Sequence, residues 1–217
     1  MLQIRQKKIS NLEPHKIQDI IFDLGGVIVG LDTSRTIAAI ARLTGVSEDE
    51  AFSIFESDKR FKEYEMGKIT DEEFRNFIRD ITTESLTDLA IDEAWNAMIL
   101  GFPQVHLDLL NHLRKHYKIH LLSNTNNIHL EYMTNKLMEA DAGGFSDYFD
   151  NEFYSHKMGM RKPNIDIYTS VLSEGGMNAE STLFLDDNLD NLKGAHSLGI
   201  NVYHVKKLTD TVSFFNG

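Results

Sequence analysis

Residues 19–29 open with a short apolar run that ends at Asp23 and is followed by two glycines: Asp19-Ile20-Ile21-Phe22-Asp23-Leu24-Gly25-Gly26-Val27-Ile28-Val29. The run is too short to cross a membrane, but it has the length of a strand buried on both faces. Burying a charge within a core strand is costly, so we expect Asp23 at the carboxyl end of the strand, where open α/β sheets bind ligands. Gly25 and Gly26 lack a Cβ atom and permit a sharp turn and close approach to a ligand. Taken alone, Asp23 could also simply begin a turn.

The length and composition of the chain limit what kind of protein it encodes. Its 217 residues fit one core with an inserted subdomain, and the 41% hydrophobic and 25% charged residues are typical of a globular protein. The net charge of −11 argues against a general surface for nucleic acid or anionic membranes. An anionic substrate would therefore need a local source of positive charge. No run approaches 18 apolar residues, so we expect no membrane span.

The chain contains no cysteine, which excludes disulfides, thiolate catalysis and cysteine-based zinc sites. Residues 1–17 are polar and lack the apolar segment of a secretory signal. We expect them to form an extension packed loosely on the core, and we expect the protein to be cytoplasmic. The sequence does not decide between a monomer and a dimer.

Residues 33–100 show the apolar spacing of helices rather than strands. Two segments, Ser47–Glu50 and Thr70–Glu73, have the S/T-x-x-E form of a capping box, which satisfies free amide donors at a helix start. We expect the aromatic side chains of this region to form its own core. The pattern predicts a small helical subdomain at residues 31–100, inserted into a core made of residues 1–30 and 101–217.

The rest of the chain alternates between short apolar strands and amphipathic helices, which predicts an α/β fold with a doubly wound parallel sheet. Predicted strands cover residues 119–122, 182–185 and 200–205. Predicted helices cover residues 105–117, 128 onward, 165–173 and 192–198. His112, His116 and His120 are four residues apart, but a strand beginning near Ile119 would remove His120 from the helix face. We therefore interpret the first two as a solvated helix end.

Polar residues follow three of the predicted strands, namely Asp23, Ser123-Asn124 and Asp186-Asp187, and a loop carries Lys162. If the strands are parallel neighbours, these groups meet at one edge of the sheet. Clustered carboxylates repel one another and favour a hard divalent cation such as Mg²⁺. The cation and Lys162 would then provide a positive phosphate-binding pocket in an acidic protein.

Four motifs occur in order: FDLGGV at 22–27, LLSN at 121–124, GMRKP at 159–163 and FLDDNLDN at 184–191. With them the chain, from Ile20 to Val205, resembles the haloacid dehalogenase-like (HAD) hydrolase superfamily. It is most similar to the phosphatase branch that includes glucose-1-phosphate phosphatase. The resemblance implies a Rossmann-like core and a helical cap that closes over the site and selects the leaving group. It also implies magnesium-dependent hydrolysis of a small phosphorylated metabolite, with a sugar phosphate as the expected substrate.

The resemblance assigns roles to the residues that meet the phosphoryl group. Asp23 would be the nucleophile and would form an aspartyl-phosphate, which divides one difficult step into two. Ser123 and the backbone at Asn124 would hold the transferred phosphoryl group. Lys162 would neutralise charge on the phosphate and on Asp23.

The resemblance also implies a metal site. Asp187 would be the main acidic Mg²⁺ ligand, joined by a carboxylate oxygen of Asp23 and the backbone carbonyl of Gly25. Asp186 and Asn191 would support the metal through water or through hydrogen bonds to its ligands. Phosphoryl transfer requires mainly positioning and charge stabilisation, which such a set supplies.

The chain departs from the family pattern at Gly25, where most family phosphatases have an aspartate that protonates the leaving group. Such general acid–base help is typically worth 10²–10⁴-fold, so a slower enzyme or a substitute group is implied. Two alternatives stay open. A metal-independent dehalogenase would use Asp23 on carbon, although Asp186 and Asp187 argue against it. A catalytically weak phosphate-binding or regulatory module is compatible with Gly25.

Overall fold

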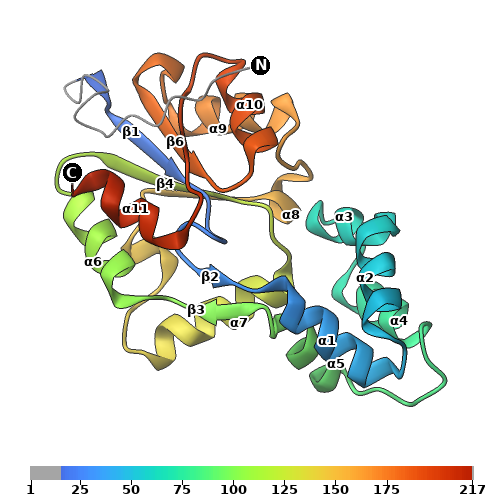
Figure 1. Cartoon of the computed structure of the whole chain (residues 1–217). Helices are drawn as coiled ribbons and strands as arrows, with labels where there is room; N and C mark the ends of the chain where they lie inside the picture. Colours follow the sequence, from blue (N-terminus) through green and yellow to red (C-terminus); the bar gives the residue numbers. More distant parts are fainter. Residues whose placement is uncertain (1–15, 217) are drawn as a thin grey trace.

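The computed structural model of the chain describes residues 16–216, so the predicted extension at residues 1–17 lies almost entirely outside them. The core is a parallel five-stranded sheet with the strand order β5-β4-β1-β6-β7 (Figure 1). Its strands are β1 (Asp19–Phe22), β4 (Lys118–Ser123), β5 (Asn151–Tyr154), β6 (Thr182–Asp186) and β7 (Asn201–His204). The predicted α/β fold with a parallel sheet is confirmed. The edge strand β5 was not predicted.

Side chains of β1 alternate between the two faces of the sheet, as strand geometry requires. Ile20 and Phe22 belong to one buried cluster and Ile21 to another. The first cluster includes residues of α6 (Gln104–Leu113), α7 (Asn127–Glu139) and α11 (Leu208–Phe215), and the second includes residues of α9 (Ile165–Gly175) and α10 (Leu189–His196). Helices therefore cover both faces (Figure 1). None of the helices within residues 16–216 is long and apolar enough to span a membrane.

Five helices follow one another between residues 33 and 96, and we call these residues the helical insert. They are α1 (Thr33–Thr44), α2 (Glu48–Ser57), α3 (Lys59–Glu65), α4 (Asp71–Arg79) and α5 (Asp88–Asn96). The insert lies to one side of the core (Figure 1). An antiparallel ribbon of β2 (Gly30–Leu31) and β3 (Ile99–Gly101) joins the two parts, so the helical pattern predicted up to residue 100 ends earlier. The predicted boundaries at residues 30 and 101 stay a prediction.

Local hydrogen bonds start two of the insert helices where the sequence predicted them. At the start of α4, the backbone N–H of Thr70 donates to the Glu73 carboxylate, and the Glu73 N–H donates to the Thr70 hydroxyl. At the start of α2, the N–H of Glu50 donates to the Ser47 hydroxyl. These bonds satisfy amide donors that the first turn of a helix leaves free.

Aromatic side chains fill the interior of the insert. The rings of Tyr64 and Phe74 stack with centroids 4.3 Å apart, and Trp95 lies 4.8 Å from Phe74. Trp95 and Phe61 also line the cavity described below. The aromatic cluster is therefore both the core of the insert and part of the cavity wall.

His120 lies in β4 and is fully buried, away from the helix that carries His112. Its Nε2 is 3.1 Å from Asp19 Oδ1, and Asn151 donates to its Nδ1 at 3.0 Å. The prediction that the three histidines do not share a helix face is confirmed.

Candidate active site

Asp23 lies at the carboxyl end of β1, where the sequence placed it. Its backbone N–H donates to the carbonyl of Leu185 at 2.9 Å, and its Oδ1 accepts from the N–H of Leu24 at 2.7 Å. The side chain is largely buried. The chain therefore fixes one oxygen of the carboxylate at the point where the neighbouring strands also end.

The two glycines after Asp23 are required for different reasons. Gly26 has φ +72°, and a Cβ there would lie 2.4 Å from Asp187 Oδ2. Gly25 has no left-handed φ, but a Cβ there would lie 2.3 Å from Cδ1 of Leu31. Gly26 thus allows the turn to approach Asp187, whereas a side chain at position 25 is opposed by a neighbouring side chain and not by backbone strain.

Lys162 is only 1% exposed and joins the ends of three strands. Its Nζ lies 2.8 Å from Asp23 Oδ1, 2.7 Å from Asp186 Oδ2 and 3.0 Å from the carbonyl of Leu122. The Asn124 side chain binds the backbone of Lys162 on both sides: its Nδ2 donates to the Lys162 carbonyl at 3.0 Å, and its Oδ1 accepts from the Lys162 N–H at 2.9 Å. Asn124 is therefore a positioning residue for Lys162, which the sequence did not predict.

The two consecutive aspartates after β6 have different surroundings. Asp186 is fully buried, and its carboxylate accepts from Lys162, from the N–H of Asn188 and from Nδ2 of Asn191. Asp187 is exposed and forms no ion pair within the part of the chain that the structure describes. Asp186 thus anchors Lys162, while Asp187 is accessible to a ligand.

The charges in this cluster are poorly balanced. Burial raises the pKa of the Asp23 carboxyl to about 7, with Lys162 opposing the shift and Asp186 adding to it. Burial lowers the pKa of Lys162, but Asp186 and Asp23 outweigh it and the net shift is upward. One firm positive charge therefore faces three carboxyl groups, and additional positive charge would favour the ionised form of Asp23.

The donor set fits a divalent cation. Carboxylate oxygens of Asp23, Asp186 and Asp187 lie within 4.8 Å of one another, and this is the one such group of metal-binding side chains found among residues 16–216. Oxygen ligands are those that Mg²⁺ prefers, at about 2.0–2.1 Å, so a small inward movement would bring two carboxylates onto one ion. Because Asp186 is already bonded to Lys162 and Asn191, Asp23 and Asp187 are the carboxylates best placed to bind it.

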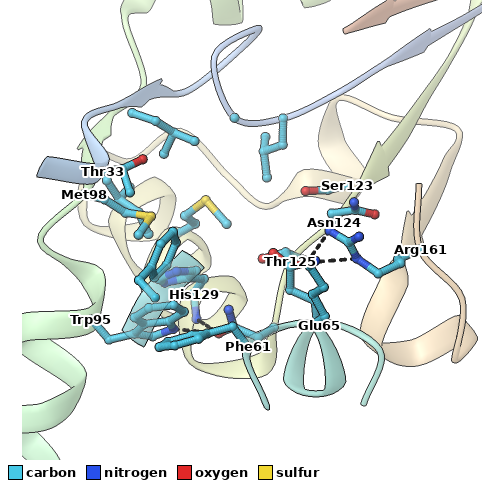
Figure 2. Close-up of a pocket in the computed structure, with 18 of the residues that line it drawn as sticks. Thr33, Phe61, Glu65, Trp95, Met98, Ser123, Asn124, Thr125, His129 and Arg161 are labelled. Carbon is cyan, nitrogen blue, oxygen red and sulfur yellow. Dashed lines mark hydrogen bonds and ion pairs between the residues drawn. The ribbon is translucent and has the colours of Figure 1, made fainter. Parts of the chain in front are cut away.

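A cavity of about 360 Å³ lies between the helical insert and the core, and its lining includes Ser123 and the two residues that follow Asp23, Leu24 and Gly25 (Figure 2). This volume is in the usual range for small-molecule sites. One side is polar and carries Ser123, Asn124 and Arg161, and the other is apolar and includes Phe61, Trp95 and Met98. The Ser123 hydroxyl has no hydrogen-bond partner within residues 16–216, which leaves it free for a ligand.

Polar contacts fasten the insert over this cavity. Arg161, next to Lys162 in the chain, donates to the Glu65 carboxylate of α3 at 2.9 and 3.1 Å. The Ser155 hydroxyl donates to the Glu65 carbonyl, and Asn127 donates to the Asp71 carboxylate at 2.9 Å. The insert is therefore bonded to the core at three places: the loop that carries Arg161 and Lys162, the start of α7, and Ser155.

The structure brings the predicted site residues together: Asp23, Gly25, Ser123, Asn124, Lys162, Asp186, Asp187 and Asn191. Their catalytic and metal-binding roles stay predictions. Sequence reasoning missed the Glu65–Arg161 pair and His129, which lines the cavity. The only sequence signal for Arg161 is its place beside Lys162, and an isolated histidine early in a helix gives no signal.

Comparison with known proteins identifies the family. The family model described as haloacid dehalogenase-like hydrolase matches residues 18–199. The D-ribitol-5-phosphate phosphatase of Bacteroides thetaiotaomicron is 28% identical over 194 residues, which are 89% of this chain and 94% of that protein. The chain belongs to the haloacid dehalogenase-like hydrolase family.

Solved structures agree with this assignment. A HAD family enzyme from B. thetaiotaomicron, in complex with magnesium and inorganic phosphate, has a TM-score of 0.81 and 35% identity, and the match covers 87% of this chain and 93% of that one. A HAD-like family hydrolase from Porphyromonas gingivalis has a TM-score of 0.79 and 30% identity, covering 87% and 91%.

Proposed function

We propose that this chain is a magnesium-dependent phosphatase that hydrolyses a sugar or sugar-alcohol phosphate through an aspartyl-phosphate on Asp23. Kinship with phosphatases over nearly its full length makes it a phosphoric monoester hydrolase acting on a phosphorylated small molecule. The observation that carries the finer proposal is the Asp23 carboxylate, 2.8 Å from Lys162 Nζ and beside a small cavity with an unpaired serine hydroxyl. D-ribitol 5-phosphate, the substrate in the name of one relative, is a suitable first test compound.

In the first step, a carboxylate oxygen of Asp23 forms a bond to phosphorus while the bond from phosphorus to the alcohol oxygen breaks. The electron pair leaves with the alcohol oxygen, which takes up a proton. Lys162 reduces the repulsion between Asp23 and the incoming anion, and the Ser123 hydroxyl donates to a phosphoryl oxygen. Asp186 and Asn124 hold Lys162 in place for this contact.

In the second step, water attacks phosphorus, the bond from phosphorus to Asp23 breaks, and inorganic phosphate leaves with the carboxylate restored. The same Lys162 and Ser123 contacts stabilise the phosphoryl charge in both steps. A magnesium ion bound by Asp23, Asp187 and the Gly25 carbonyl would neutralise further charge on the phosphoryl oxygens.

The proposal is tested by measuring inorganic phosphate released from a panel of phosphate esters with added Mg²⁺ and with a chelator. We expect magnesium-dependent turnover of D-ribitol 5-phosphate or a related sugar phosphate. Halide release from 2-chloropropionate without metal would instead support the dehalogenase alternative. Phosphate binding without turnover of any ester would support the binding-module alternative.

Asp187→Ala should weaken Mg²⁺ binding, because it removes the accessible carboxylate of the cluster. We expect the Mg²⁺ concentration for half-maximal rate to rise by about 10- to 100-fold, the range typical of disturbed metal sites. A magnesium titration of phosphate release measures this. Asp190→Ala is the control, because Asp190 is exposed and pairs with Lys193 instead. Equal titrations for wild type and Asp187→Ala would contradict the proposed ligand.

Magnesium binding should release protons near neutral pH. Because burial raises the pKa of Asp23 to about 7, this carboxyl is largely protonated below pH 7 and ionised above it. A cation binds the ionised form, so Mg²⁺ affinity should rise with pH up to about 8 and then level off. Calorimetric titrations in buffers of different ionisation enthalpy measure the released proton. Asp23→Asn should abolish the release, and a heat independent of buffer at pH 6.5 would contradict the raised pKa.

A further inference from the structure

His129 lies where the helical insert meets the core. It belongs to the first turn of α7, and its backbone N–H donates to the side chain of Asn126, the cap of that helix. Its ring stacks on Trp95 of α5, with centroids 4.8 Å apart and planes 8° apart, and its Nδ1 lies 2.8 Å from Asn96 Oδ1. Trp95 and Asn96 therefore fix the orientation of the imidazole.

These contacts also determine which nitrogen of His129 carries the proton. The Oδ1 atom of Asn96 can only accept a hydrogen bond, so Nδ1 of His129 must donate. Burial lowers the pKa of His129 to about 3, which keeps the ring neutral at physiological pH. Nε2 therefore holds a lone pair and acts only as an acceptor.

The Nε2 atom of His129 is available to a ligand. It has no hydrogen-bond partner among residues 16–216, and, unlike the unpaired nitrogens of His106 and His156, it is not sealed from solvent. His129 lines the cavity between the insert and the core, on the side of Trp95 and away from Ser123 (Figure 2). The acceptor thus opens on the part of the cavity that lies beyond the phosphate-binding groups.

We propose that His129 selects the leaving group of the phosphate ester by accepting a hydrogen bond at Nε2 from one of its hydroxyls. This inference rests on the proposed phosphatase function and names a chemical requirement of its substrate. Trp95 and Met98 make the neighbouring wall of the cavity apolar. A hydroxyl buried in this part of the cavity would therefore find a hydrogen-bond partner at His129. A leaving group without that hydroxyl would bury Nε2 unpaired, which is costly. A hydroxylated leaving group should therefore be preferred by roughly 10- to 100-fold.

The test compares two esters with the same number of carbons, D-ribitol 5-phosphate and n-pentyl phosphate, on wild type and His129→Phe. Phenylalanine keeps a ring against Trp95 but removes both nitrogens. We expect kcat/KM for ribitol phosphate to fall by roughly 10- to 100-fold, while kcat/KM for pentyl phosphate changes by less than about threefold. His129→Gln should recover part of the loss, because its amide oxygen can accept the same hydrogen bond. His116→Phe, a substitution at an exposed histidine, is the matched control.

An independent readout is the tautomer of His129 in two-bond ¹H–¹⁵N correlation spectra of the wild-type protein. We expect an unprotonated Nε2 whose signal shifts when ribitol phosphate is added to the inactive Asp23→Asn variant. If the ratio of kcat/KM for the two esters is the same in His129→Phe as in wild type, the inference is overturned while the phosphatase proposal stays intact. A wild-type protein inactive on every ester would instead refute the proposed function, and the role of His129 with it.

Discussion

Asp23→Asn is expected to abolish phosphate release while leaving the fold intact. An amide cannot form the acyl phosphate, so the rate should fall by on the order of 10⁴-fold or more. The asparagine oxygen can still accept from the N–H of Leu24 and from Lys162, the two contacts that hold Asp23 Oδ1. The measurement is phosphate release at saturating Mg²⁺, beside a thermal melt of the metal-free protein.

The raised pKa of Asp23 also predicts how the melting temperature of Asp23→Asn compares with that of wild type. A carboxyl whose folded pKa is raised destabilises the fold as pH rises through the window from its unfolded pKa of about 4 to its folded pKa of about 7. Asp23→Asn lacks this charge, so at pH 8 its melting temperature should equal or exceed that of wild type. Asp190→Asn, at an exposed carboxylate, should change neither the rate of phosphate release nor the melting temperature. Activity of Asp23→Asn within tenfold of wild type would contradict its assignment as the nucleophile.

The sequence predicted much of this site because its residues follow strands. Asp23 follows β1, Ser123 ends β4, and Asp186 ends β6. In a parallel sheet all carboxyl ends lie at one edge, and these residues meet there because β4 and β6 flank β1. Lys162 lies in a loop and not at the end of a strand, so the sheet alone does not place it, and the family motif at residues 159–163 supported its position in the site.

The parts that were missed depend on short elements and on contacts between distant residues. The ribbon strand β2 has two residues and β3 has three, too few to show a period, and β5 begins with the polar residues Asn151 and Glu152 instead of an apolar run. Glu65 and Arg161 are 96 residues apart, and their ion pair exists only because the insert lies over the core. The stacking of His129 on Trp95 has the same origin.

A side chain at position 25 would be opposed by a neighbouring residue and not by the backbone conformation. The sequence predicted that Gly25 permits a sharp turn, but the φ angle of Gly25 is not in the left-handed region. The obstacle is Leu31 of the β2 strand, whose Cδ1 occupies the position a Cβ would approach. Leu31 is 43% exposed, so the obstacle can be removed by substitution.

The double variant Gly25→Asp/Leu31→Ala should therefore test whether a missing acid limits the rate. If it does, wild type should cleave para-nitrophenyl phosphate, whose leaving group needs no proton, much faster than simple alkyl phosphates. The new carboxyl would stand two residues after the nucleophile and could protonate the alcohol. It should narrow the gap between the two substrates, by up to the 10²–10⁴-fold that acid catalysis supplies. The ratio of kcat/KM for the two esters measures this directly.

Two further variants separate chemistry from shape. Leu31→Ala alone should leave the ratio unchanged, because it opens space without adding an acid. Gly25→Asn/Leu31→Ala places a side chain of the same size at position 25 without a proton to donate, and it should also leave the ratio unchanged. Melting curves identify any variant that fails by unfolding. If wild type shows little dependence on the leaving group and the folded double variant gains nothing, then another group or the substrate supplies the proton, and Gly25 does not limit catalysis.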